Sequence, residues 1–318
     1  MQSLDRRDFL KTSLASTAAF TLPSLARAAI GSGAGATVEV TLVAEGEIKT
    51  LIDGTSILIW QFRDLGGAGL GDLASALVVA AGDTVNVSVQ NHLDRDINFI
   101  VPGVLTGSLA VMPGESRIYS FTAPAAGSYL YQDGLNDELS RAMGLTGPLV
   151  VMPADGSNRL YPGGSAFDRQ YTLVLGELDD RLNRAIADGL GYDMNDYEPN
   201  YFTVNGLSYP DTASDTDTLV AMNRGEEVAI RFINAGLITY PMHFHGYHVR
   251  VATRDRVAET AVVDKDTVLV GVGECVDVIL PVTQSGAYPL HTHYVPGVTA
   301  NGVYVNPYGG GLIVMSAV

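Results

Sequence analysis

The chain has 318 residues and a formal net charge of −16 at pH 7, with 35 acidic side chains against 19 basic ones. This negative charge argues against nucleic acid and against anionic membranes as partners, because both are themselves negatively charged. The chain contains one cysteine, Cys275, so an intramolecular disulfide and a zinc cluster of Cys-x-x-Cys pairs are both excluded.

The first 28 residues are predicted to be an export signal that is removed from the mature protein. Residues 5–11 read Asp-Arg-Arg-Asp-Phe-Leu-Lys, a mildly apolar run extends from 12 to 25, and Ala-Arg-Ala at 26–28 is a small-x-small cleavage site. An amphipathic first helix, the alternative, would not need this order of features. We therefore expect twin-arginine export and a periplasmic or secreted protein. No later apolar run is long enough to span a membrane, so no membrane association is expected after signal removal.

Most of the remaining chain consists of short runs rich in Val, Ile, Thr and Tyr, separated by Gly, Pro, Asn and Asp. This pattern predicts β-strands rather than helices. The clearest predicted strands are residues 37–42, 84–89, 171–175, 228–233 and 276–280. Helical turns are predicted at 136–142 and around 182–188. The sequence thus predicts an all-β protein.

The chain also repeats its own pattern. Residues 82–91, Gly-Asp-Thr-Val-Asn-Val-Ser-Val-Gln-Asn, correspond to residues 225–234, Gly-Glu-Glu-Val-Ala-Ile-Arg-Phe-Ile-Asn. Three further pairs of segments follow in the same order, namely 100–103 with 243–246, 113–116 with 272–275, and 127–134 with 286–293. A repeat of this kind predicts two copies of one β-domain. We place them at 38–155 and 168–318, joined by a linker that begins at Met152.

Four of the six histidines form two His-x-His pairs, His243 with His245 and His291 with His293. Alternate residues of a strand point to the same face, so each pair places two imidazoles side by side. Two such strands facing each other would make a four-imidazole cage, and imidazole suits copper, zinc, iron or nickel. One pair alone could be coincidence or simple hydrogen bonding. Two pairs in a chain so poor in histidine indicate a transition-metal site.

The repeat assigns this metal site to the second half of the chain. At the four matching positions the first half has Ile100, Pro102, Gln132 and Gly134, which are not metal ligands of this class. Both histidine pairs therefore fall on equivalent, adjacent strands of one domain. We expect the domain at 168–318 to carry the metal alone.

These segments resemble the cupredoxin domains of the multicopper oxidases. Residues 91–94, Asn-His-Leu-Asp, and 144–151, Gly-Leu-Thr-Gly-Pro-Leu-Val-Val, follow the frame of the family's first domain. Residues 240–247, Tyr-Pro-Met-His-Phe-His-Gly-Tyr, and 286–293, Gly-Ala-Tyr-Pro-Leu-His-Thr-His, follow its last domain. The resemblance covers nearly all of the mature chain. It implies two tandem cupredoxin-like Greek-key β-sandwich domains, similar to small laccases and copper nitrite reductases, with copper as cofactor at one or two ions per chain. It also implies a homotrimer.

The sequence departs from the family at the blue type 1 copper, which needs a Cys thiolate and two His. Thr292 stands at the Cys position, Tyr240 at one His position, and residues 295–298 contain no His where the other is expected. Cys275 does not replace the thiolate, because it matches Ser116 in the repeat and so lies on a different strand. It is expected to be a small packed side chain. The first-domain ligands of the family's trinuclear cluster are also missing, so a conventional laccase is not expected.

Several residues beside the expected ligands have no assigned role. His92 and His248 lie outside the metal motif. Five further side chains could relay electrons, although packing is the default for each: Tyr240, Met242, Tyr247, Tyr288 and Tyr294. The turn-rich loop at 297–311 is longer than a plain connection needs, and we expect it to cover the metal or to form a subunit contact.

Three functions remain open at this point. The first is a copper-dependent oxidoreductase that acts on oxygen or on a small-molecule substrate, which the sequence does not name. The second is copper binding without turnover, for which the eight scattered methionines give little support because soft Met-rich tracts would be expected. The third is a metal-free cupredoxin scaffold. Retention of all four histidines in one domain favours the first function over the third.

Overall fold

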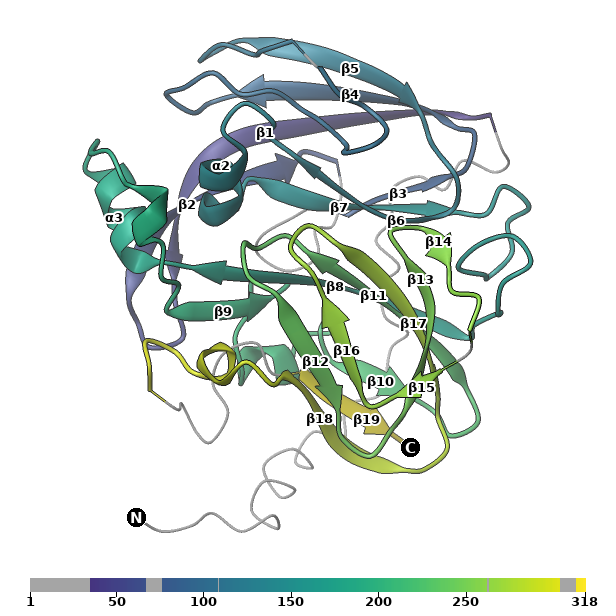
Figure 1. The fold of residues 1–318 in the computed structure, drawn as a ribbon. Coiled ribbons are helices and arrows are strands. Elements are labelled where there is room, and N and C mark those ends of the chain that lie inside the picture. The colour runs from purple at the N-terminus through teal and green to yellow at the C-terminus, as the bar shows by residue number, and fades with distance from the viewer. Residues whose placement is uncertain (1–34, 67–75, 108, 262, 304–312) are drawn as a thin grey trace.

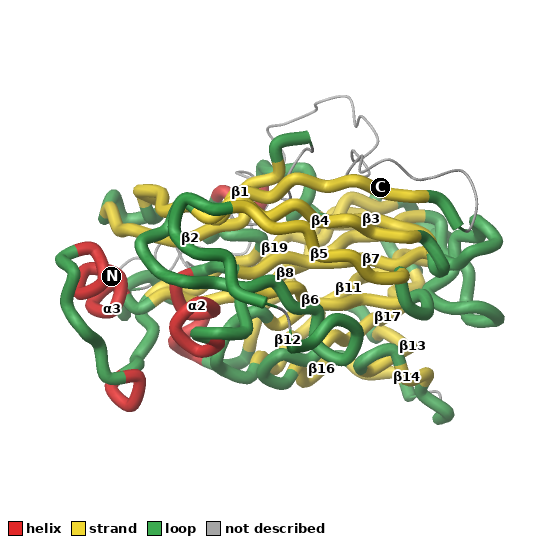
Figure 2. The backbone as a smooth tube through the Cα atoms, turned by 90° about the horizontal axis from the view of Figure 1, so that it is seen from above, coloured by secondary structure: helices red, strands yellow, loops and turns green. Residues whose placement is uncertain are grey.

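A computed structural model describes residues 35–66, 76–107, 109–261, 263–303 and 313–318. The expected export signal at 1–28 and residues 304–311 of the predicted loop lie outside these residues. Two α-helices, α2 (Asp137–Met143) and α3 (Asp180–Ala187), lie at one end of the strand layers, as Figure 1 and Figure 2 show. Three 3-10 helices are also present in the described residues: η1 (Met194–Asp196), η2 (Asp211–Ala213) and η3 (Val295–Val298). The predicted all-β class is confirmed, and α2 and α3 fall at the two predicted helical turns.

The first half of the chain folds into two sheets that enclose one core. One sheet has the strand order β2-β1-β4-β5 and the other β3-β7-β6. Val85, Val87 and Val89 alternate into this core with no exposed surface, as the period-2 pattern of a strand with one solvated face requires. The strand bounds are β1 (Thr37–Thr50), β2 (Ser56–Asp64), β3 (Leu77–Ala80), β4 (Thr84–Asn91), β5 (Ser116–Thr122), β6 (Gly127–Gln132) and β7 (Thr146–Met152).

The second half also contains two sheets around one core. The larger has the order β14-β13-β17-β11-β8-β9 with β15 paired to β13, and the smaller has the order β10-β19-β18-β12-β16. The larger sheet contains β8 (Arg169–Leu178), β9 (Tyr201–Val204), β11 (Glu227–Asn234), β13 (Val249–Arg254), β14 (Val257–Ala258), β15 (Asp264–Lys265) and β17 (Cys275–Pro281). The smaller contains β10 (Val220–Met222), β12 (Tyr240–Phe244), β16 (Thr267–Val270), β18 (Gly286–Thr292) and β19 (Ile313–Ala317).

Both halves pair their repeated strands in the same way. The repeat segment at 82–91 forms β4, which lies parallel to β1 and antiparallel to β5. The segment at 225–234 forms β11, which lies parallel to β8 and antiparallel to β17. The sequence repeat therefore corresponds to a repeat of strand topology. The division into domains at 38–155 and 168–318 remains our proposal. One element crosses this boundary: α3 follows β8 along the chain, yet it packs on the first half through the fully buried Leu182.

The two halves are joined by a buried interface between β6 of the first half and β11 and β17 of the second. Cys275 lies here in an apolar cluster with Leu130 and Ile233, and it is 3% exposed. The prediction that it is a small packed side chain is confirmed, and burial raises the pKa of its thiol. Next to this cluster Ser128 Oγ donates a hydrogen bond to Asp277 Oδ1 over 2.6 Å. Polar as well as apolar contacts therefore fix the halves to each other.

Candidate metal centre

The two histidine pairs lie on neighbouring antiparallel strands. In the β12–β18 ladder His243 is directly opposite His291. The ladder continues past both strand ends, because the backbone N–H of His245 donates to the carbonyl of Pro289 and that of His293 donates to the carbonyl of Pro241. Residues 242 and 244 point into the core, so the histidines point away from it. The predicted placement of both pairs on one face of adjacent strands is confirmed.

The four imidazole rings form one cluster. The centroid of the His243 ring lies 4.8 Å from that of the His245 ring, 5.8 Å from that of the His291 ring and 4.3 Å from that of the His293 ring. The ring nitrogens His245 Nε2 and His291 Nε2 are 2.9 Å apart. His293 is exposed and the other three are partly buried. The cluster thus opens to solvent on one side.

Neighbouring carbonyl groups fix the tautomers of two of these rings. His243 Nδ1 lies 3.0 Å from the carbonyl oxygen of Asp266 and 3.0 Å from Thr267 Oγ1. His291 Nδ1 lies 2.9 Å from the carbonyl oxygen of Thr292. A carbonyl oxygen only accepts hydrogen bonds, so in the neutral imidazole each Nδ1 carries the proton and each Nε2 presents a lone pair. This is the arrangement found in metal-ligating histidines.

Burial also favours the neutral form of one ligand candidate. Desolvation lowers the pKa of His291, and the positive charges that its three neighbours could carry lower it further, against the opposing effect of the Thr292 carbonyl. A neutral imidazole is the form that binds metal.

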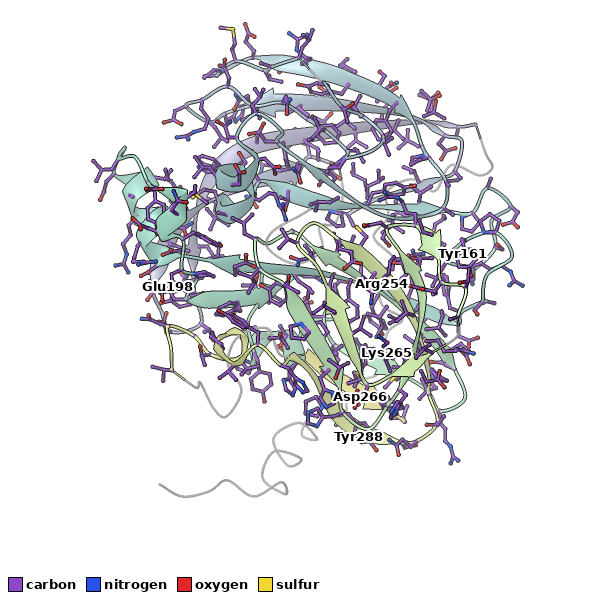
Figure 3. All side chains as sticks on the ribbon, in the orientation of Figure 1. Tyr161, Glu198, Arg254, Lys265, Asp266 and Tyr288 are labelled. Atoms are coloured by element: carbon purple, nitrogen blue, oxygen red, sulfur yellow. The ribbon has the colours of Figure 1, made fainter. Side chains whose placement is uncertain are left out.

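Asp266, whose carbonyl accepts a hydrogen bond from His243, shows where the cluster lies in the molecule. Asp266 and Tyr288 are at the lower edge of the second half in Figure 3, where the lower ends of β12, β16 and β18 are seen in Figure 1.

Imidazole nitrogens are suitable ligands for copper. In the observed ring orientations, two of the four imidazoles are spaced so that they could bind one ion. Two imidazole nitrogens that bind one ion at about 2.0 Å and at a right angle are about 2.8 Å apart. The Nε2 atoms of His245 and His291, at 2.9 Å, have nearly this spacing. In the described residues, however, no group of three or more His, Cys, Asp or Glu side chains is placed so that it could hold a metal as it stands. A larger ligand set would require the His243 and His293 rings to turn toward the pair.

The matching positions of the first half contain no such cluster. Ile100 and Gln132 form an isolated β-bridge, and Gln132 Nε2 donates to Asp137 Oδ1 over 2.6 Å. Gly134 has no room for a side chain, because a Cβ there would overlap Ile100. Pro102 is exposed. The geometry at Ile100, Gln132 and Gly134 is therefore that of a packed strand pair.

The positions where the resemblance places type 1 copper ligands are filled by other buried groups. Thr292 is 2% exposed, and its Oγ1 accepts a hydrogen bond from the backbone N–H of Tyr294 over 3.1 Å. Tyr240 is also 2% exposed, and its hydroxyl donates to Glu177 Oε2 over 2.5 Å. Sequence reasoning missed Glu177. Its signal was a lone carboxylate inside the apolar strand Tyr-Thr-Leu-Val-Leu-Gly-Glu-Leu at 171–178.

Tyr247, Tyr288 and Met242, which the sequence also singled out, have packing roles. The Tyr247 ring packs edge-on against that of Tyr288 at 5.2 Å, and its hydroxyl donates to the Gln284 carbonyl. Met242 is 1% exposed in the second core. His92 and His248 are exposed and outside the cluster.

The hydroxyl of Thr267 offers a test of how the His243 ring is held. Thr267→Val removes one of the two acceptors for Nδ1 while keeping the β-branched shape, so we expect copper affinity to fall about tenfold, the low end for loss of such a supporting group. Competition against a chelator of known affinity measures the change. Leu269→Thr, on the exposed face of the same strand, is the control. Equal affinities of Thr267→Val and wild type would contradict the assigned support.

Fold and histidine cluster together describe a two-domain β-sandwich protein with a surface imidazole site, and comparisons with known proteins identify its family. Residues 72–156 and 187–306 each match a family model described as multicopper oxidase, and together these segments span well over half of the chain. The chain belongs to the multicopper oxidase family. Residues 3–23 match the twin-arginine translocation signal, so the expected export to the periplasm or beyond is confirmed. No helix in the described residues is long and apolar enough to cross a membrane.

The relatives that match this chain have low sequence identity to it. A copper-containing nitrite reductase from Alcaligenes xylosoxydans xylosoxydans is 25% identical over 68% of this chain and 71% of its own length. Putative laccase-5 from Oryza sativa subsp. japonica is 28% identical over 51% of this chain, and the match spans only 31% of that relative.

Solved structures confirm the expected fold. The blue copper oxidase from Nitrosomonas europaea superposes with a TM-score of 0.74 at 24% identity, covering 88% of this chain and 86% of that one. The copper nitrite reductase from Nitrosomonas europaea superposes with a TM-score of 0.67 at 21% identity, covering 89% and 94%. The predicted tandem of two cupredoxin-like domains is confirmed.

Proposed function

We propose that the protein is an exported copper-binding oxidoreductase that works directly at a histidine-only copper site and is not a conventional laccase. The observation that carries this proposal is the cluster of four imidazoles, with two Nε2 atoms 2.9 Å apart. The chain's one thiol does not belong to this cluster, since Cys275 is buried at the interface between the halves.

His245 and His291 would hold the first copper, and His243 and His293 would complete the set for one or two ions per chain. Bound copper supplies a one-electron redox change and open coordination positions for a substrate. The chain's own groups orient the ligands: the Asp266 carbonyl and Thr267 hold the His243 ring. Because His293 is exposed, a small substrate could reach the site from solvent without a tunnel.

A metal-free scaffold is the second candidate, and one observation favours it. No three candidate ligands in the described residues converge as they stand. If the histidine rings keep these orientations, the 2.9 Å contact between His245 and His291 is only a hydrogen bond between imidazoles. Copper binding without turnover would share the metal site with the first candidate and the lack of activity with the second. Metal analysis separates the scaffold from the others, and oxygen uptake with added reductants separates the remaining two.

Copper analysis of protein folded with copper available is the direct test. We expect at least one copper per chain and no intense blue absorption, because no thiolate lies at the site. The double variant His243→Ala, His293→Ala is expected to lose the copper. The matched control is His92→Ala, His248→Ala, which removes the chain's other two histidines, both exposed. A copper-free wild type, or a His243/His293 variant that keeps its copper, would refute the site.

We also propose that the protein is a homotrimer, a proposal supported by the family resemblance. The expected light-scattering mass of the mature protein is three times that of one chain. The measurement should be made with and without copper, since a site exposed at the surface could bind metal before or after assembly. A mass of one chain under both conditions would contradict the trimer without affecting the copper site.

A further inference from the structure

A buried tyrosine–carboxylate pair lies on the core side of the strand that carries His243. Tyr240 of β12 and Glu177 of β8 are 2% and 3% exposed. The Tyr240 hydroxyl donates to Glu177 Oε2 over 2.5 Å, and the backbone N–H of Leu237 donates to the other carboxylate oxygen. A side chain at position 236 would overlap the carboxylate, so Gly236 creates the space that Glu177 occupies.

The surroundings of Glu177 suit a carboxylate that can take up a proton. The Tyr240 hydroxyl and the Leu237 N–H both donate to it, which matches an acceptor-only carboxylate. The Arg141 guanidinium lies close enough to stabilise the negative charge. Burial acts in the opposite direction and is the largest influence, raising the pKa of Glu177. Because its pKa is raised, the Glu177 carboxylate is a stronger base than a carboxylate in water.

Tyr197 also lies beside Glu177, but its hydroxyl donates to the Glu177 backbone carbonyl over 3.5 Å. Two other tyrosines donate to carboxylates in different surroundings. Tyr201 donates to Asp53 over 2.9 Å, but Asp53 is exposed. Tyr192 donates to Asp179 over 2.9 Å, but this carboxylate is already paired with Arg181. Neither bond joins two almost fully buried partners, as the Tyr240–Glu177 bond does.

The position of Tyr240 connects the pair to the candidate metal centre and to the surface. Tyr240 precedes His243 by three residues on β12. The phenols of Tyr240 and Tyr294, the residue after His293, are near enough to interact electrostatically. The Tyr294 ring is 38% exposed and packs edge-on against Phe202 at 5.9 Å. Tyr294 therefore brings one partly exposed aromatic ring near the buried pair.

We propose that Tyr240 is redox-active, with Glu177 as its proton acceptor. A one-electron oxidant removes an electron from the ring of Tyr240, the Oη–H bond breaks, and the proton forms an O–H bond with Glu177 Oε2. The products are a neutral phenoxyl radical, a protonated carboxyl and the oxidant reduced by one electron; the reverse transfer restores the starting state. Moving the proton avoids a buried phenol cation, which would be costly in an apolar interior. In the exported protein the oxidant would be copper(II) at the histidines, and in this respect the proposal rests on the proposed function.

The test uses copper-free protein, so its outcome is independent of the copper site. A photoexcited ruthenium polypyridyl complex with a cobalt(III) electron acceptor provides the one-electron oxidant. Transient absorption and electron paramagnetic resonance then follow the tyrosyl radical. We expect a long-lived radical in the wild type, loss of most of it in Tyr240→Phe, and formation slowed about 100-fold in Glu177→Gln, the low end for removal of a positioned base. Tyr247→Phe is the matched control, because this buried tyrosine donates to a backbone carbonyl.

Two results would overturn the proposal. One is a long-lived radical of wild-type yield in folded Tyr240→Phe, and the other is a wild-type rate of formation in folded Glu177→Gln. Circular dichroism and the denaturation midpoint establish that each variant is folded. If a variant does not fold, the wild type itself gives the answer through the rate of radical formation in light and heavy water. A slower rate in heavy water is expected for coupled proton transfer, and equal rates would overturn the assignment of Glu177.

Discussion

Asp277→Ala is expected to destabilise the protein by about 3–5 kcal/mol, the cost of leaving a buried ionic partner uncompensated. Arg231 is 0% exposed and Asp277 is 1% exposed, and Arg231 NH1 lies 3.4 Å from Asp277 Oδ2. The same carboxylate also accepts from Ser128 Oγ over 2.6 Å and from Thr253 Oγ1 over 3.0 Å. Burial lowers the pKa of Arg231, against the opposing effect of Asp277. Equilibrium unfolding in denaturant measures the free energy of unfolding of the variant and of the wild type.

Two controls separate the unpaired charge from other causes. The double variant Arg231→Met, Asp277→Leu removes both charges together, and we expect it to recover most of the lost stability, as replacement of buried ion pairs by apolar residues commonly does. Glu45→Ala breaks a more exposed pair with Arg63 and is expected to cost no more than about 1 kcal/mol. A loss below about 1 kcal/mol in Asp277→Ala would show that Arg231 is stabilised by other groups, such as Gln170, which accepts from its Nε over 3.1 Å.

The copper-loaded wild type is expected to reduce oxygen to water with generic phenols more slowly than about one turnover per second, the lower limit of ordinary enzyme rates. Four-electron laccase turnover needs a thiolate-bound copper that collects electrons one at a time. The family resemblance places Thr292 and Tyr240 at two of its ligand positions, and both residues are buried and hydrogen-bonded. The same resemblance places Ile100 and Gln132, which form a β-bridge here, where the other half of an oxygen-reducing cluster would be. Oxygen consumption with a dye donor measures the rate.

Thr292→Cys sharpens this prediction. The variant restores a thiol to the site, but we expect no laccase turnover, since Tyr240 and residues 295–298 still supply no imidazole. The copper-depleted His243→Ala, His293→Ala variant gives the background rate. Robust oxygen-to-water reduction by the wild type would mean that ligands outside the four histidines complete a cluster.

Much of the fold could be predicted because strand geometry is local. The alternation Val85, Val87, Val89 assigns one face of β4 to the core from the sequence alone. The same period of two places His243 and His245 on one face, and the repeat puts His291 and His293 on the adjacent strand. Strand ends were less predictable: β1 continues to Thr50, eight residues past the predicted end at 42, because its pairing with β2 extends there. Pairing is a property of the partner strand as well.

The sequence by itself determined which residues carry imidazoles, which face they share and which half of the chain holds them. The tertiary structure decided which groups meet across long separations. Glu177 and Tyr240 are 63 residues apart and Ser128 and Asp277 are 149 apart, yet each pair shares a buried hydrogen bond. The approach of His245 Nε2 to His291 Nε2 likewise depends on side-chain rotation. A residue's type and spacing are written in the sequence, whereas its partner depends on how the sheets pack, because burial leaves each polar group dependent on whichever neighbour the fold brings within reach.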